Sequence, residues 1–303
     1  MHRTRLLCAL ALIAASLVSA CGTADPGWPP QQTRFALLPA LVSAEVTLGQ
    51  NRLLFNILDA NTNQSIAAPD RPVEVRLFDF STDRTRPAMT AQAAYMATVE
   101  GRPGLYRVIA ELTRAGEWGV ELSATEADGS KRIGRMVFPV REAGSTPAIG
   151  AAAPLSDTPT AGTDDEIAQI STDDDPDPDF YRESISEALA AEEPFAVVFA
   201  TPAFCSSATC APTLDLVKSV AAQYKNRMSF IHVEPYELEE VDGELRPVLS
   251  EQNSPIPVKA VNTWGLPTEP YIFVVDRDGN VSAKFEGIAS ADELRAAFEQ
   301  VSR

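Results

Sequence analysis

Hydrophobic and polar side chains alternate along residues 35–140. Apolar residues occupy every second position in five segments: Leu53, Phe55 and Ile57; Val73, Val75 and Leu77; Tyr106, Val108, Ala110 and Leu112; Trp118, Val120, Leu122 and Ala124; and Met136, Phe138 and Val140. A period of two is typical of strands that bury one face. Turn residues such as Asp128-Gly129 lie between the segments and separate the strands. The pattern predicts an all-β domain with Trp118 in its core.

About seven strands within roughly 105 residues fit an immunoglobulin-like sandwich, which we place at residues 35–141. Gly104-Leu105-Tyr106, followed by Ala115-Gly116-Glu117-Trp118, resembles the ending of small exported sandwich domains of the YtkA type. The segment has no catalytic constellation and no His, Cys or Met cluster for a metal. We therefore expect this domain to act as a spacer or a docking module.

The pattern changes in the second half of the chain. Residues 195–201 and 271–276 are continuous apolar runs, which is typical of strands buried on both faces. Between them, Leu214, Val217, Val220 and Ala221 fall on one side of a helix expected at 206–224. Further helices are expected at 181–191, 258–264 and 291–301, and strands at 167–171, 228–234 and 281–285. This order predicts an α/β domain at residues 180–303, with residue 165 as an alternative start.

Residues 142–179 read as a Pro- and Asp-rich linker and lead-in. The acidic run at 173–179 could suggest calcium, but it lacks the glycine and distal glutamate of an EF-hand loop. We expect a solvated, proline-stiffened loop there.

The N-terminus carries an export signal. Residues 1–5 are basic and residues 6–18 are apolar, as in a signal peptide, here placed at residues 1–20. The apolar run is too short to span a bilayer. Residues 21–34 are polar and rich in proline, which favours a tether.

Val18-Ser19-Ala20-Cys21 resembles the bacterial lipobox. The resemblance implies that Cys21 is acylated after cleavage and anchors the protein to the extracytoplasmic face of a membrane. The net charge of the chain is −17. Such a surface repels nucleic acid, so we expect no nucleic-acid partner.

Two cysteines remain for chemistry once Cys8 leaves with the signal and Cys21 carries lipid. They are Cys205 and Cys210, five positions apart. In an oxidising compartment such a pair is either a structural staple or a redox pair.

The residues around this pair resemble the thioredoxin-like superfamily, which includes redoxin, TlpA-like and peroxiredoxin-related domains. Phe199-Ala200-Thr201-Pro202-Ala203-Phe204-Cys205 places a cysteine just after a buried strand, and Ala211-Pro212-Thr213-Leu214-Asp215 resembles the second helix of thioredoxin. Thr268-Glu269-Pro270 stands where the superfamily keeps its cis-proline. Residues 149–154 resemble the lead-in of peroxiredoxin and TlpA-like domains.

The resemblance implies an extracytoplasmic thiol–disulfide oxidoreductase without a cofactor. Cys205 would attack, Cys210 would resolve and Pro270 would shape the site. The expected groove residues are Pro202, Phe204, Trp264 and Glu269. Protein thiols or disulfides would be the substrates, together with a separate redox partner.

The cysteine spacing departs from the Cys-x-x-Cys of thioredoxin. In an ideal helix, residues five apart have Cα atoms about 8–9 Å apart, whereas a disulfide needs less than about 7 Å. The first helical turn must therefore be distorted when the pair is oxidised. We expect Cys205 to open the helix and to be the more acidic and more exposed thiol, with Cys210 deeper in the helix.

Three alternatives remain open from the sequence. Thr201-Pro202 and the Cys-x4-Cys spacing resemble Q-type peroxiredoxins, but Glu269 and Pro270 replace the arginine of that family, which argues against peroxidase activity. Sco-type copper chaperones use a different spacing and a distal histidine. Copper or zinc could still bind Cys205, Cys210 and His232, although we expect His232 to be a packed residue. The third alternative is a non-catalytic lipoprotein with a structural disulfide.

Overall fold

The computed structural model describes Trp28, residues 37–97 and residues 103–303. The expected signal peptide, Cys21 and all of the expected tether except Trp28 lie outside the described residues. Within the described part, no helix has the length and apolar character needed to cross a membrane.

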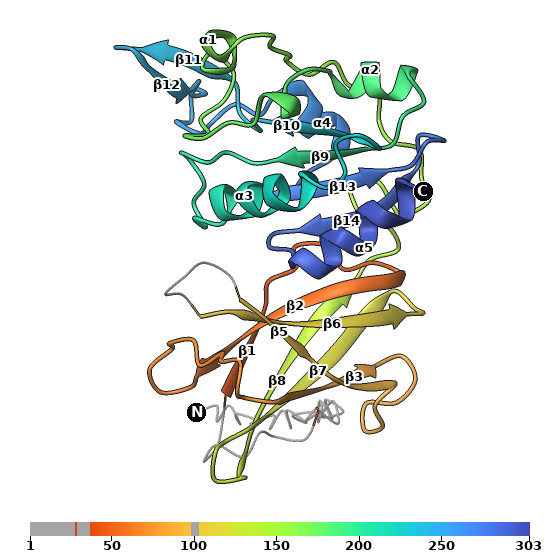
Figure 1. The fold of residues 1–303 in the computed structure, drawn as a ribbon. Coiled ribbons are helices and arrows are strands. Elements are labelled where there is room, and N and C mark those ends of the chain that lie inside the picture. Colours follow the sequence, from red (N-terminus) through yellow and green to blue (C-terminus); the bar gives the residue numbers. More distant parts are fainter. Residues whose placement is uncertain (1–27, 29–36, 98–102) are drawn as a thin grey trace, which may run out of the picture. The chain divides into compact units, whose positions relative to one another are not determined.

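Two antiparallel four-stranded sheets form the N-terminal domain (Figure 1). One has the order β1-β2-β6-β5, built from Leu37–Leu41, Gly49–Asp59, Leu105–Leu112 and Ala94–Met96. The other has the order β4-β3-β7-β8, built from Met89–Gln92, Val73–Asp79, Gly116–Thr125 and Lys131–Val140. Inward-facing side chains of both sheets share one core, so the arrangement is sandwich-like.

The alternating pattern predicted the long strands of this domain correctly. Phe55, Tyr106, Trp118 and Phe138 are all at most 2% exposed, and the Trp118 indole donates a hydrogen bond to the Arg114 carbonyl. The short strands β1, β4 and β5 were not predicted, because most of their residues are partly exposed and alternate weakly. The finer, immunoglobulin-like assignment stays a prediction.

A mixed sheet forms the centre of the C-terminal domain, in the order β10-β9-β13-β14. Its strands are Ser229–Val233, Phe195–Phe199, Tyr271–Val275 and Val281–Glu286. Helices α3 (Cys210–Ala221) and α5 (Ala291–Val301) share a core with one face. Helices α2 (Ile185–Ala190) and α4 (Lys259–Trp264) share a core with the other. Burial on both faces explains why β9 and β13 are apolar at every position.

Three features of this domain differ from the expectation. Residues 167–171 are not a strand, since Asp164–Ile167 form the short helix α1 with a Thr163–Glu166 capping box. A hairpin of β11 (Leu238–Val241) and β12 (Glu244–Pro247) was not predicted. Helix α3 begins at Cys210 instead of residue 206.

Residues 149–154 run beside the start of β14, where Gly150 N–H donates to the Val281 carbonyl at 2.8 Å.

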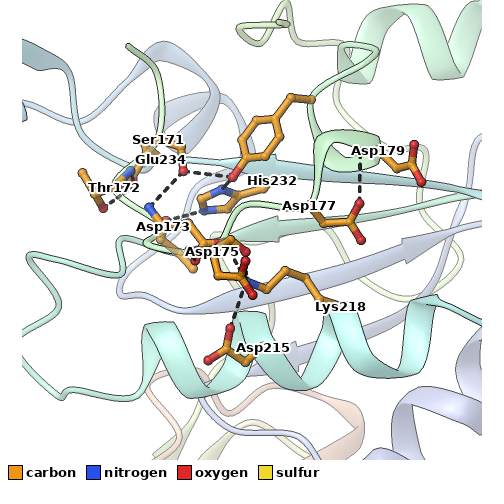
Figure 2. Close-up of polar contacts among 12 residues, drawn as sticks. Ser171, Thr172, Asp173, Asp175, Asp177, Asp179, Asp215, Lys218, His232 and Glu234 are labelled. Atoms are coloured by element: carbon orange, nitrogen blue, oxygen red, sulfur yellow. Dashed lines mark hydrogen bonds and ion pairs between the residues drawn. The ribbon is translucent and has the colours of Figure 1, made fainter. Parts of the chain in front are cut away.

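The acidic run at 173–179 is not the solvated loop that we expected. Asp173 forms an ion pair with Lys218 of α3 at 2.7 Å (Figure 2). Lys225 forms ion pairs with both Asp177 and Asp179. The one-turn 3₁₀ helix η2 (Pro178–Phe180) follows, with Asp177 as its N-cap. Phe180 and Tyr181, which follow the acidic run, are buried in a core that they share with residues of α3. Their burial places the acidic run next to this helix. The domain boundaries themselves stay predictions.

Ionic contacts connect the sandwich to the C-terminal domain, and residues from Leu37 onward belong to one compact unit. Arg52 of β2 and Arg107 of β6 reach Glu293 of α5 at 2.7 and 2.5 Å. Glu293 also completes the capping box of α5 with Ser290. Burial alone would raise the pKa of Glu293, but the hydrogen bonds and charge of Arg52, together with Arg107, lower it to about 2.

This ion cluster predicts a pH-dependent contribution to stability. A carboxyl whose pKa is lowered on folding stabilises the protein above its unfolded pKa, and the contribution is lost as the pH falls toward the folded value. Glu293→Gln should therefore lower the free energy of unfolding by about 2–3 kcal/mol at pH 7. The difference from wild type should shrink progressively as the pH falls below about 4.5.

Urea unfolding at a series of pH values measures this difference. Asp292→Asn is the matched control, because Asp292 lies in the same helical turn with its side chain 96% exposed. A Glu293→Gln effect that stays constant from pH 7 to pH 3, or one no larger than that of Asp292→Asn, would contradict the assignment.

Candidate redox site

A disulfide joins Cys205 and Cys210, whose Cα atoms are 5.9 Å apart. Residues 202–209 between β9 and α3 form a non-helical run with several turns. Ala208 N–H donates to the Cys205 carbonyl at 3.1 Å, and Ala208 itself adopts a left-handed conformation with φ of 56°. This tight turn brings the two Cα atoms closer than the about 8–9 Å of an ideal helix.

The expected positions of the two cysteines relative to the helix are wrong. Cys210 is the first residue of α3 and is fully buried, whereas Cys205 lies in the preceding loop and is partly exposed. The reason is geometric, because a helix that began at residue 206 would hold the Cα atoms too far apart for a disulfide. Pro212 lies in the first turn of α3, where its missing N–H removes no helical hydrogen bond.

Each sulfur has a different source of thiolate stabilisation. Cys210 is the first residue of α3, where a helix has free backbone N–H groups and the positive end of its dipole. Cys205 Sγ instead lies 3.2 Å from Ser207 Oγ, which lies 2.7 Å from Thr209 Oγ1. Since Cys210 is fully buried, accessibility makes Cys205 the sulfur that a second molecule can reach.

Pro270 follows a cis peptide bond and directly precedes β13. The register pairs Tyr271 with Phe199, so Pro270 lies across from the end of β9, where the cysteine loop departs. The Pro270 carbonyl accepts a hydrogen bond from Gly287 N–H at 2.8 Å. The two segments that the sequence assigned to the site thus leave the sheet on neighbouring strands.

The four expected groove residues divide into two groups. Pro202, Phe204 and Glu269 are partly exposed, and Glu269 accepts a hydrogen bond from the Tyr236 hydroxyl at 3.0 Å. Trp264 was placed wrongly. Its side chain is fully buried against Phe199 and Phe273, and its indole N–H donates to Ser156 Oγ. A ring with no exposed surface cannot line a substrate groove.

His232 is a buried, hydrogen-bonded residue, as expected. Its Nε2 lies 2.9 Å from the Ala200 carbonyl and its Nδ1 lies 2.8 Å from the Tyr181 hydroxyl. A carbonyl can only accept, so Nε2 carries the proton and Nδ1 accepts from Tyr181. Burial lowers the pKa of His232, which keeps the ring neutral. Figure 2 shows this chain of contacts continuing to Ser171.

Glu234 supports the cysteine loop and was not predicted from the sequence. Its Oε1 accepts hydrogen bonds from Thr172 N–H at 2.7 Å and Thr172 Oγ1 at 2.5 Å. Thr172 Oγ1 in turn accepts from Ala203 N–H in the cysteine loop at 3.2 Å. Glu234 is 6% exposed, and its second oxygen has no hydrogen-bond partner among the described residues. A charged residue directly after a buried strand is the signal that could have identified it.

No group of three or more His, Cys, Asp or Glu side chains that could hold a metal is found in the part of the chain that the structure describes. His232 uses both ring nitrogens in hydrogen bonds. It would have to give up one of these bonds to coordinate copper or zinc.

Residues 181–302 match the protein-family model described as a thioredoxin-like domain. The C-terminal domain is thioredoxin-like. The match covers β9, the cysteine loop, α3 and Pro270 but not the sandwich. It confirms the family resemblance that the residues around the cysteine pair indicated.

Similarity to solved structures is weak. The soluble domain of PmoD from Methylocystis sp. ATCC 49242 (Rockwell) is 14% identical, with a TM-score of 0.21 over 34% of this chain and 88% of that one. A protein assigned as a glycoside hydrolase from Bacteroides vulgatus ATCC 8482 is 12% identical, with a TM-score of 0.23 over 70% of this chain and 34% of that one. Our chain thus spans about a third of the hydrolase. Curated proteins give no match.

The thioredoxin-like domain should show unequal thiol reactivity when reduced. Near neutral pH, a small alkylating reagent should modify Cys205 about tenfold faster than the buried Cys210. Ser207→Ala should slow Cys205 about fivefold, because the lost hydrogen bond is worth about 1 kcal/mol. Mass spectrometry of labelled peptides at timed intervals measures both rates.

Ser206→Ala is the matched control, because Ser206 is an exposed neighbour in the same loop. Equal labelling of the two cysteines, or faster labelling of Cys210, would overturn the assignment of roles. Failure of either thiol to react before denaturation would favour a structural disulfide instead.

Proposed function

We propose that the thioredoxin-like domain is an extracytoplasmic thiol–disulfide oxidoreductase that exchanges electrons through Cys205 and Cys210. The observation that carries the proposal is the asymmetry of the pair. One sulfur is partly exposed in the loop after β9, and the other is buried at the first residue of a helix. A purely structural disulfide does not require that one of its sulfurs be exposed to solvent.

The exchange proceeds in two steps. A thiolate of a partner protein attacks Cys205 Sγ and forms a new S–S bond while the Cys205–Cys210 bond breaks. The electron pair leaves with Cys210, which takes up a proton. A second partner thiolate then attacks the partner sulfur of this mixed disulfide and releases Cys205. The partner dithiol is oxidised to a disulfide, and the pair is reduced by two electrons. The reverse sequence reduces a partner disulfide.

The position of Cys210 favours the first of these steps. The rate of thiol–disulfide exchange rises when the departing thiolate is stabilised. Cys210 departs at the start of α3, a helix of 12 residues, where free N–H groups and the helix dipole stabilise negative charge. The domain therefore separates the accessible, attacked sulfur from the stabilised, departing one.

The loop that carries Cys205 is held from inside the domain. Glu234 fixes Thr172, and Thr172 fixes Ala203, two residues before Cys205. The ion pair of Asp173 with Lys218 ties the same segment to α3. This support holds the attacked sulfur on a fixed backbone, which an in-line exchange between three sulfurs requires.

The proposed location rests on the N-terminal sequence. A basic start, an apolar run and the lipobox-like Val18-Ser19-Ala20-Cys21 support a lipid anchor on Cys21. We propose that the anchor holds the redox domain at the extracytoplasmic face of the membrane, where its partners would be exported proteins.

Trapping of mixed disulfides tests this proposal. In cells that produce the full chain with Cys210→Ser, Cys205 can still attack a partner disulfide but cannot be resolved. Reductant-sensitive complexes should accumulate in the membrane fraction, at least about tenfold above those formed by the Cys205→Ser control, whose remaining cysteine is buried. Adding Cys21→Ser should move the complexes to the soluble fraction.

Equal amounts of complex from the two single variants would contradict the roles of the cysteines. An absence of complexes from Cys210→Ser would contradict the exchange function. Complexes that stay with salt-washed membranes after Cys21→Ser would contradict the lipid anchor but not the exchange function.

A further inference from the structure

The sandwich domain contributes to a cavity beside the disulfide. This cavity has a volume of about 300 Å³. On one side it is lined by Ser207 and Thr209, which lie between the two cysteines, and by Thr268 and Glu269, which precede Pro270. On the other side it is lined by sandwich residues, among them Val42, Leu54 and Leu105. Ser207 Oγ lies 3.2 Å from Cys205 Sγ, so the cavity lies close to this sulfur and both domains line it.

The sandwich side of the cavity is held in place by several contacts. Leu54 and Met96 pack against Ile288, which follows β14. Arg52 donates to the Ile288 carbonyl at 2.7 Å, and Ala44 N–H donates to Glu286 Oε1 at 2.6 Å. Because the half-buried Arg52–Glu293 pair adds to these contacts, the apolar wall is held against the C-terminal domain.

The chemistry of the lining indicates what could bind. Val42 is 43% exposed and Leu105 is partly exposed, so both present apolar surface. The carboxyl groups of Glu269 and Glu286 also line the cavity, and no Lys or Arg lines it among the described residues. The volume is at the small end of ligand sites, which are about 300–1,000 Å³. An apolar side chain with a basic or neutral neighbour fits this lining; an acidic neighbour does not.

We infer that the sandwich forms the specificity wall of the redox site. Its occupant is a cysteine-containing polypeptide segment of the partner protein, with an apolar side chain next to the cysteine and no acidic residue beside it. The apolar side chain packs against Val42 and Leu105 while the partner sulfur meets Cys205. This inference rests on the proposed exchange function and names the substrate class of that site. Small dithiols lack the side chain and do not use the wall.

Peptide kinetics test the inference on the full-length protein. The probes are three cysteine peptides that differ only next to the cysteine, with Leu-Cys-Lys, Ser-Cys-Lys or Leu-Cys-Glu at the centre. The rate at which each peptide reduces Cys205–Cys210 is divided by its rate with a small aromatic disulfide, which removes differences in thiol reactivity. Dithiothreitol serves as the small-molecule reference.

Wild-type protein should prefer the Leu-Cys-Lys peptide to Ser-Cys-Lys by about tenfold, because packing a leucine side chain is worth about 1.5–3 kcal/mol when complete. It should also react more slowly with Leu-Cys-Glu, because the added carboxylate would lie near those of Glu269 and Glu286. Val42→Ser and Leu105→Ser should each reduce the Leu-over-Ser preference to about threefold or less. Their rates with dithiothreitol should stay unchanged. Val137→Ser is the matched control, because Val137 is an exposed apolar residue of β8 outside the cavity.

Two outcomes separate the inference from the proposed function. An unchanged peptide preference in both wall variants, with a normal dithiothreitol rate, would overturn the specificity wall and leave the exchange function intact. A pair that neither dithiothreitol nor any peptide reduces in the wild-type protein would overturn the exchange function itself. The partial exposure of Val42 and Leu105 makes both variants compatible with folding, which the unfolding midpoint verifies.

Discussion

The five-residue spacing of Cys205 and Cys210 is the constraint on which the C-terminal site depends. Their Cα atoms are 5.9 Å apart, which a helix through both residues would not allow. A turn with Ala208 in the left-handed conformation shortens the distance between the two Cα atoms, and α3 begins only at Cys210. Because the helix begins at the second cysteine, Cys205 lies in a loop and Cys210 lies at the start of a helix. This difference gives the two cysteines separate roles.

The surroundings of the loop follow from this arrangement. A loop without helical hydrogen bonds needs other contacts to hold its conformation. Thr172 Oγ1 accepts a hydrogen bond from Ala203 N–H in this loop, and Glu234 accepts one from Thr172 N–H. The acidic segment that contains Thr172 and Asp173 is tied to α3 by Lys218. On the other side, Arg52, Arg107 and Glu293 fix the sandwich against α5. Each of these contacts joins residues from distant parts of the chain.

The sequence predicted the features that local patterns encode. Period-two alternation identified the long strands around Phe55, Tyr106 and Trp118, and the residues around Cys205 and Pro270 identified the family. It could not predict where α3 begins, because the apolar spacing of Leu214, Val217 and Ala221 is the same for either start and Thr209 gives no side-chain cap. The acidic run looked solvated because its partners, Lys218 and Lys225, lie far along the chain. Trp264 illustrates the same limit, since burial depends on tertiary packing.

Electron exchange with partner proteins requires that Cys205–Cys210 can be reduced by ordinary thiols, which the reduction potential of the pair measures. Equilibration of the full-length protein with dithiothreitol or glutathione buffers, followed by mass analysis of trapped thiols, gives the value. A redox pair should lie between about −120 and −270 mV, the range of known exchange domains. A value below about −300 mV, typical of structural disulfides, would contradict the account and identify Cys205–Cys210 as a staple.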